Sequence, residues 1–146
     1  MKILVIDGMG GGIGKAVVEK LLEHFSSKEN KSTKKPMIIA AGTNAIATSA
    51  MIKAGADLGA TGENAIIHNS KTANVIIGSM GIVIANSMLG EISPAIALAI
   101  SSGEAEKILI PTSKCSIHIA GLHDLPTAQY IDEIPGILER LEASLV

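Results

Sequence analysis

A run of glycines near the start of the chain is the feature that most clearly predicts chemistry. Residues 7–15 read DGMGGGIGK, after a short apolar run and before an amphipathic segment. Glycines leave backbone N–H groups accessible, and the first amides of a helix have no partner within the helix, so such a loop suits a phosphate. The residues that we expect to bind the phosphates of a nucleotide or dinucleotide are Gly8, Gly10, Gly11, Gly12, Ile13 and Gly14.

The spacing of these glycines differs from two common phosphate-binding loops. The dinucleotide fingerprint GxGxxG is not met, because its third glycine, counted from Gly8 and Gly10, falls on Ile13. The Walker-type loop GxxxxGK[ST] is not met either, because Met9 stands at its first glycine and Ala16 at its magnesium-binding hydroxyl. Magnesium-dependent ATP hydrolysis is therefore the less favoured interpretation.

The spacing of Gly8, Gly12 and Gly14 resembles instead the GxxxGxG loop of short-chain dehydrogenases. That resemblance implies a catalytic Tyr-x-x-x-Lys pair elsewhere in the chain. The only tyrosine is Tyr130, and Ile134 stands four residues after it. The resemblance to these enzymes is thus confined to the loop.

Further small and hydroxyl-bearing residues follow later predicted strands. In an open parallel sheet, ligands bind beyond the carboxyl ends of the strands, so these loops meet at one edge. The second predicted strand ends without the Asp or Glu that binds the ribose of NAD. Thr43 or Asn44, with Lys34 or Lys35, suits a 2′-phosphate. NADP or a mononucleotide therefore fits at least as well as NAD. Capping of a helix explains Thr43 and Asn44 equally well. The additional residues expected at this edge are Gly42, Thr43, Asn44, Gly78, Ser79, Met80, Gly81 and residues 111–115.

Side chains for acid–base or nucleophilic chemistry are few. Glu91 is the first acid to test for catalysis, although a carboxylate near a helix start explains it more simply. Cys115 lies beside Lys114, which would lower its thiol pKa, but a lone cysteine is more often a small buried apolar residue. His118 alternates with isoleucines in a predicted strand. No two histidines have the spacing of metal ligands, so we assign no metal.

Apolar runs of strand length alternate with amphipathic segments along the chain. This pattern predicts a single α/β domain over residues 1–146, with a Rossmann-like, doubly wound, mostly parallel sheet of five or six strands and helices on both faces. Residues 81–89 fit either a strand or a helix. The expected strands are residues 2–6, 37–41, 56–60, 74–78, 107–110 and 116–120, and the expected helices are 13–25, 45–55, 63–72, 95–100 and 134–145.

Composition excludes some partners. The net charge is −2, and one tyrosine and one phenylalanine are the only aromatic residues, so we expect no nucleic-acid partner. The longest apolar stretch, residues 75–89, is interrupted by glycine, serine and asparagine, and we expect no membrane segment. A single cysteine and the lack of a signal-peptide pattern predict a cytoplasmic protein.

Several segments together resemble a family of short bacterial proteins known only as a domain of unknown function. The resemblance spans nearly the whole chain and implies a Rossmann-like fold, but no activity, cofactor or catalytic residue. Besides the glycine loop, it rests on residues 42–48 (GTNAIAT), 62–65 (GENA), 75–78 (VIIG), 89–92 (LGEI) and 108–111 (ILIP).

Three functional hypotheses follow. The first is a nucleotide-binding enzyme, NADP-dependent in one version, whose substrate site is completed by homo-oligomerisation. The second is a non-catalytic sensor or binding module for a phosphorylated metabolite. In the third, the glycine loop is only a tight structural turn and binds no nucleotide.

Overall fold

The computed structural model describes residues 1–28, 34–112 and 116–144 and is organised around a five-stranded sheet. All neighbouring strands pair in parallel, in the order β3-β2-β1-β4-β5. This is the strand order of the Rossmann type, and the predicted α/β fold is confirmed. The strands are β1 (Lys2–Asp7), β2 (Met37–Gly42), β3 (Leu58–Thr61), β4 (Val75–Ser79) and β5 (Glu106–Ile110).

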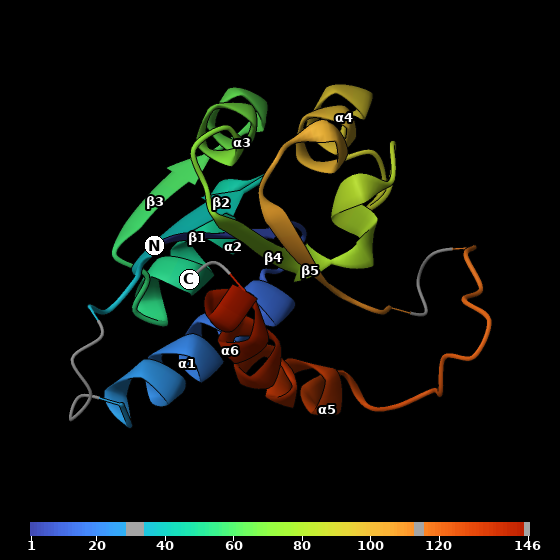
Figure 1. Cartoon of the computed structure of the whole chain (residues 1–146). Helices are drawn as coiled ribbons and strands as arrows, with labels where there is room; N and C mark the ends of the chain where they lie inside the picture. The colour runs from blue at the N-terminus through green and yellow to red at the C-terminus, as the bar shows by residue number, and fades with distance from the viewer. Residues whose placement is uncertain (29–33, 113–115, 145–146) are drawn as a thin grey trace.

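Helices cover both faces of the sheet (Figure 1). Alternate residues of β1 face opposite sides: Ile3 and Val5 pack with α1, α2, α5 and α6, whereas Leu4 and Ile6 pack with the other helices. All four side chains are fully buried, which explains the continuous apolar run in the sequence. The helices are α1 (Gly12–Ser26), α2 (Ala45–Lys53), α3 (Glu63–Ser70), the 3-10 helix η1 (Met80–Val83), α4 (Pro94–Ser102), α5 (Thr127–Asp132) and α6 (Ile134–Ser144).

The helix starts follow local sequence chemistry. The Asn44 side chain accepts a hydrogen bond from the Ala47 amide and caps α2, and Ser93 caps α4 in front of Pro94. By contrast, α1 begins after Gly11, whose backbone is left-handed, and no side-chain cap is present there. The first turn of α1 therefore keeps unsatisfied amides at the carboxyl edge of the sheet.

The strand expected at 116–120 does not form. These residues are exposed and have no regular secondary structure, with Ile117 and Ile119 43% and 48% accessible. A parallel neighbour for β5 needs a crossover of a dozen or more residues, roughly, and only residues 111–115 separate the two segments. His118 consequently lies in an exposed segment, which runs away from the sheet toward α5 (Figure 1).

Residues 81–89 are neither strand nor regular α-helix. The segment begins in η1 and continues as a series of turns up to Gly90. The short helix α5 was not expected from the sequence; it precedes the predicted C-terminal helix. None of the helices within the described ranges is long and apolar enough to cross a membrane.

The strand order defines where a ligand site is expected. From β1 the chain moves outward to β2 and β3, then returns to the other side of β1 for β4 and β5. The loops after β1 and β4 therefore diverge toward opposite faces and leave a crevice between them.

Candidate functional site

A cavity of about 840 Å³ lies at this crevice, within the size range of small-molecule sites. Its wall combines the loop after β1, the end of β4 and the turns that follow η1. The lining residues are Asp7, Gly8, Met9, Gly10, Gly11, Gly12, Ile13, Ser79, Gly81, residues 84–89, Thr112, Ser116 and Ile117.

Three glycines of the loop are required by packing. A Cβ atom at Gly8 would lie 2.7 Å from Thr43 Oγ1, and one at Gly14 would lie 2.8 Å from the Cβ of Asp7. At Gly11, φ is +74° and a Cβ would lie 2.8 Å from the Cα of Ala47. These buried glycines let the loop fit between β1, α1 and α2.

Two other glycines of the loop have no such explanation. Gly10 and Gly12 are exposed, and a Cβ at either position would meet no atom within 4 Å. Among the residues that the structure describes, the amides of Gly10, Gly12 and Ile13 have no hydrogen-bond acceptor. The loop thus presents open backbone donors toward the cavity.

Asp7 lies beneath the loop. Its carboxylate accepts hydrogen bonds from the amides of Gly8 at 2.8 Å and Gly14 at 2.6 Å. Burial raises the pKa of Asp7, the two amides oppose that shift, and the charge of Glu91 adds to it. Because Gly14 donates to Asp7, its amide is not available to a ligand.

Glu91 connects the glycine loop to the loop after β2. Its carboxylate accepts hydrogen bonds from the Met9 amide at 2.9 Å, Thr43 Oγ1 at 2.9 Å and Asn44 Nδ2 at 2.6 Å. The Asn44 bond is the largest cause of a lowered pKa for Glu91, and the bonds from Thr43 and Met9 act in the same direction against desolvation. Ser93, and not Glu91, caps the start of α4. The Glu91 carboxylate is bonded to the loops after β1 and β2, so stabilisation of the α4 start does not explain this residue.

Ser79 brings a polar group to the floor of the cavity. The residue ends β4 and is 3% exposed. Its hydroxyl makes no hydrogen bond with any of the described residues. The oxygen keeps some accessible surface, so it can meet a ligand atom in the cavity.

The rim of the cavity is apolar and its backbone is unusual. Asn86, Met88 and Leu89 all have left-handed backbones, with φ of 64°, 55° and 56°. The side chain of Leu89 is 93% exposed, and Met9 and Ile117, which also line the cavity, are each 43% exposed. A strained turn that displays apolar side chains at a cavity mouth is typical of a functional segment.

The family comparison matches residues 2–142 to the model described as Domain of unknown function (DUF3842). The chain belongs to the DUF3842 family. The resemblance inferred from the sequence motifs is confirmed, and the match covers all strands and most of the helices. No curated protein and no solved structure matches the chain.

The DUF3842 fold brings many of the predicted site residues together. Gly8, Gly10, Gly11, Gly12, Ile13 and Ser79 line the cavity. Gly14 lies buried under the loop, and Gly78 is buried in β4, where a Cβ would lie 2.7 Å from the Ile6 carbonyl oxygen. Gly42, Thr43 and Asn44 end or follow β2 outside the cavity lining. Thr43 and Asn44 are joined to the glycine loop through Glu91, and Asn44 Nδ2 also donates directly to the Met9 carbonyl oxygen at 3.0 Å.

Other residues predicted from the sequence to take part in the site lie away from the cavity. Lys34 and Lys35 precede β2, at the amino edge of the sheet, and Lys35 lies 3.8 Å from Asp57. They are therefore far from the carboxyl edge at which a 2′-phosphate was expected. His118 is exposed and outside the cavity lining, and Cys115 falls outside the described residues. No group of three or more metal-binding side chains occurs in the described ranges.

Two parts of the candidate site are not predicted by the sequence. One is Asp7, an acid at the end of an otherwise apolar strand and directly before glycines, which is itself a signal. The other is the wall formed by residues 84–89, for which Asn86 and Gly90 give only a turn signal. Their position beside the cavity depends on the strand order.

Proposed function

We propose that this chain binds a nucleotide or dinucleotide in the cavity between β1 and β4, with phosphate oxygens at the amides of Gly10, Gly12 and Ile13. The observation that carries the proposal is the open space at Gly10 and Gly12, since packing explains the other glycines of the loop but not these two. A side chain at either position would point into the space that a phosphate needs.

The rest of the cavity suits a nucleoside. The thioethers of Met9 and Met88 and the side chain of Leu89 supply an apolar rim for a flat base or nicotinamide ring. Ser79 and Asp7 supply polar groups for ribose hydroxyls deeper in the cavity. The described lining contains no lysine, arginine or histidine, which favours a dinucleotide diphosphate over a more highly charged triphosphate. NADP is our first candidate, with its 2′-phosphate outside this lining, beside Thr43 and Asn44, because β2 ends without the acid that binds the ribose of NAD.

A non-catalytic sensor is the second candidate. Asp7 is the only titratable side chain among the described lining residues, which leaves few groups for acid–base chemistry. We further propose that the protein works in the cytoplasm, where such nucleotides are abundant, and as a homo-oligomer.

A thermal-shift panel of NAD, NADP, ATP, CoA and S-adenosylmethionine tests the proposal. A ligand at 100 times its Kd raises the free energy of unfolding by about 2.7 kcal/mol. We expect a shift with a dinucleotide and its loss in Gly12→Val, because a Cβ at Gly12 enters open space and leaves the fold intact. Consumption of the bound nucleotide over time would distinguish an enzyme from a sensor.

Gly136→Val is the matched control. Gly136 lies in α6, outside the cavity lining, and a Cβ there would approach Arg140 no closer than 3.7 Å. This variant should keep the full shift. Undiminished affinity in Gly12→Val would show that the phosphates do not lie at the glycine loop, and no shift with any compound would favour a purely structural turn.

A further inference from the structure

Three hydrogen-bond donors from two loops converge on one carboxylate outside the cavity lining. The Met9 amide, Thr43 Oγ1 and Asn44 Nδ2 all donate to Glu91, at 2.6 to 2.9 Å. Donors of this kind, a backbone amide with hydroxyl and side-chain amide groups, are those that proteins use to bind phosphate. We call this set the anion receptor.

The anion receptor adjoins the cavity. Met9 belongs to both, since its backbone donates to Glu91 while the residue lines the cavity. A Cβ at Gly8, which also lines the cavity, would lie 2.7 Å from Thr43 Oγ1 and 3.6 Å from Glu91 Oε2. A ligand in the cavity therefore needs only a short extension past Gly8 to reach the receptor.

The segment that delivers Glu91 is held in an unfavourable conformation. The turn before Glu91 contains Met88 and Leu89, two residues with left-handed backbones that are not glycine. The Leu89 side chain is 93% exposed. Packing of Leu89 thus does not compensate for its backbone strain. Withdrawal of Glu91 would let this turn relax, which lowers the cost of replacing the carboxylate with another anion.

We propose that the anion receptor is a binding site for a phosphate monoester and that Glu91 occupies it in the free protein as a displaceable internal anion. A monoester fits because it offers more negative charge and more acceptor oxygens than a carboxylate. This inference rests on the proposed function for its natural ligand: in NADP, the 2′-phosphate is the monoester, and the diphosphate stays at the glycine loop.

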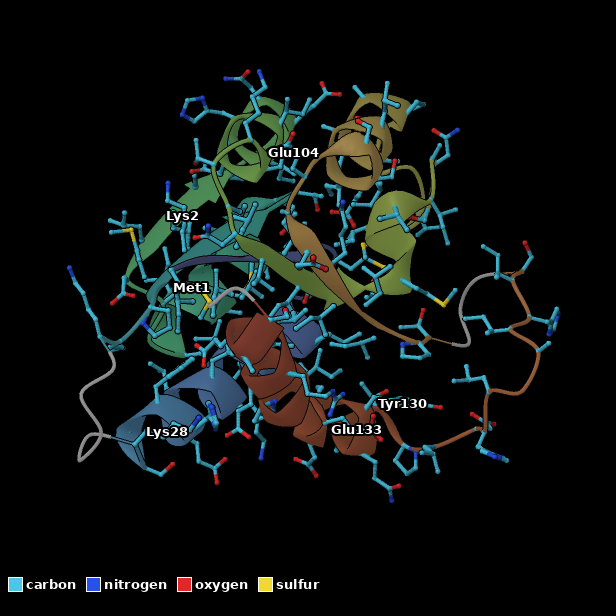
Figure 2. The ribbon with its side chains drawn as sticks, viewed as in Figure 1. Met1, Lys2, Lys28, Glu104, Tyr130 and Glu133 are labelled. Carbon is cyan, nitrogen blue, oxygen red and sulfur yellow. The ribbon has the colours of Figure 1, made fainter. Side chains whose placement is uncertain are left out.

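Binding of inorganic phosphate, measured by titration calorimetry, tests the inference without any nucleotide. Glu91→Gln keeps the size of the side chain but removes its charge, and we expect it to bind phosphate at least about fivefold more tightly than the wild type. Thr43→Val in the Glu91→Gln background should abolish this gain, because it removes one receptor donor. Glu104→Gln changes an exposed carboxylate that precedes β5, at the amino edge of the sheet and so away from the receptor, and it should match the wild type (Glu104 is labelled in Figure 2).

A second variant should favour binding of Glu91 over binding of phosphate at the anion receptor. Leu89→Gly retains Glu91 and all three donors but suits the left-handed backbone, so it should hold Glu91 in place and weaken phosphate binding. This arm decides the question if Glu91→Gln does not fold.

The two proposals fail in different ways. Equal or weaker phosphate binding by folded Glu91→Gln would overturn the displaceable anion and show that Glu91 is a fixed structural link, even if NADP binds at the glycine loop. A gain in phosphate affinity that Thr43→Val leaves intact would overturn the receptor, because the phosphate would then lie elsewhere. If no nucleotide binds but the phosphate results are as expected, only the proposed function is wrong.

Discussion

Asp7 and Glu91 are two carboxylates near one loop, and their surroundings shift their pKa values in opposite directions. Burial dominates at Asp7 and raises its pKa, whereas hydrogen bonds from Asn44, Thr43 and Met9 dominate at Glu91 and lower its pKa. The ionised form of Glu91 therefore helps to hold the loops after β1 and β2 together. The buried Asp7 instead satisfies loop amides at a cost in desolvation.

The lowered pKa of Glu91 predicts a pH-dependent contribution to stability. The ionised carboxylate stabilises the fold above the ordinary glutamate pKa of about 4.3, and this contribution is lost as the pH falls through the lower pKa of the folded state. The difference in unfolding free energy between wild type and Glu91→Gln should therefore shrink between pH 6 and pH 3, as measured by urea denaturation. In a Thr43→Val background, the unfolding free energies with and without Glu91→Gln should differ less in their pH dependence. A destabilisation by Glu91→Gln that grows toward acidic pH would contradict this account.

Contacts between elements explain why part of the glycine loop tolerates no side chain. Gly11 precedes α1 and lies against Ala47 of α2, so its left-handed backbone and lack of a Cβ set the distance between the two helices. Gly10 is next to it in sequence but makes no such contact. The two positions therefore form a matched pair for mutation.

Gly11→Ala should lower the free energy of unfolding by about 2–4 kcal/mol, the combined cost of a left-handed alanine and of overpacking. Gly10→Ala should change it by no more than about 0.5 kcal/mol, as at an ordinary surface position. Chemical denaturation of both variants measures the difference. Equal losses in the two variants would mean that the loop does not pack as described.

Most elements could be predicted because their signals are local. Buried strands such as β1 and β4 appear as continuous apolar runs, and Asn44 and Ser93 mark the starts of α2 and α4. The failures depend on long-range geometry. The alternating residues 116–120 look like a strand, but the connection after β5 is too short for the parallel pairing of this sheet, and the segment leaves the sheet instead of pairing with β5.

The candidate site was predictable only in part, for the same reason. Glycines after a first strand indicate a phosphate loop, and residues at strand ends can be assigned to one edge of the sheet. Glu91 and Thr43 are far apart in sequence, so no local sequence pattern predicts the hydrogen bond between them. The division between packed and open glycines depends on the tertiary structure, since Gly11 and Gly12 are identical residues in adjacent positions.

At the scale of the whole molecule, one edge of the sheet is both open and apolar. β3 is an edge strand without a charged residue or proline, and Leu58 in it is 56% exposed. Ile46 and Ile52 of the neighbouring helix α2 are 71% and 46% exposed. Such an edge is a template for pairing with another strand, which supports the proposed homo-oligomer.

Leu58→Lys should convert the proposed oligomer into a monomer, because a charge on an edge strand opposes edge-to-edge pairing. Light scattering coupled to size-exclusion chromatography measures the change in mass. Leu98→Lys, at an exposed position on α4, is the control and should leave the mass unchanged. A wild type that is already monomeric at high micromolar concentration would exclude an assembly through β3.

The exposed segment from Ser116 to Pro126 joins the cavity to α5, where the Tyr130 hydroxyl accepts a hydrogen bond from the Leu125 amide (Figure 2). Beyond it, Ile131, Ile134 and Leu138 enter the same core as β1. The two sides of this segment are therefore held together by apolar burial as well as by the covalent chain. A cut within it would yield two fragments with complementary surfaces, and the protein is in this respect a natural candidate for fragment complementation.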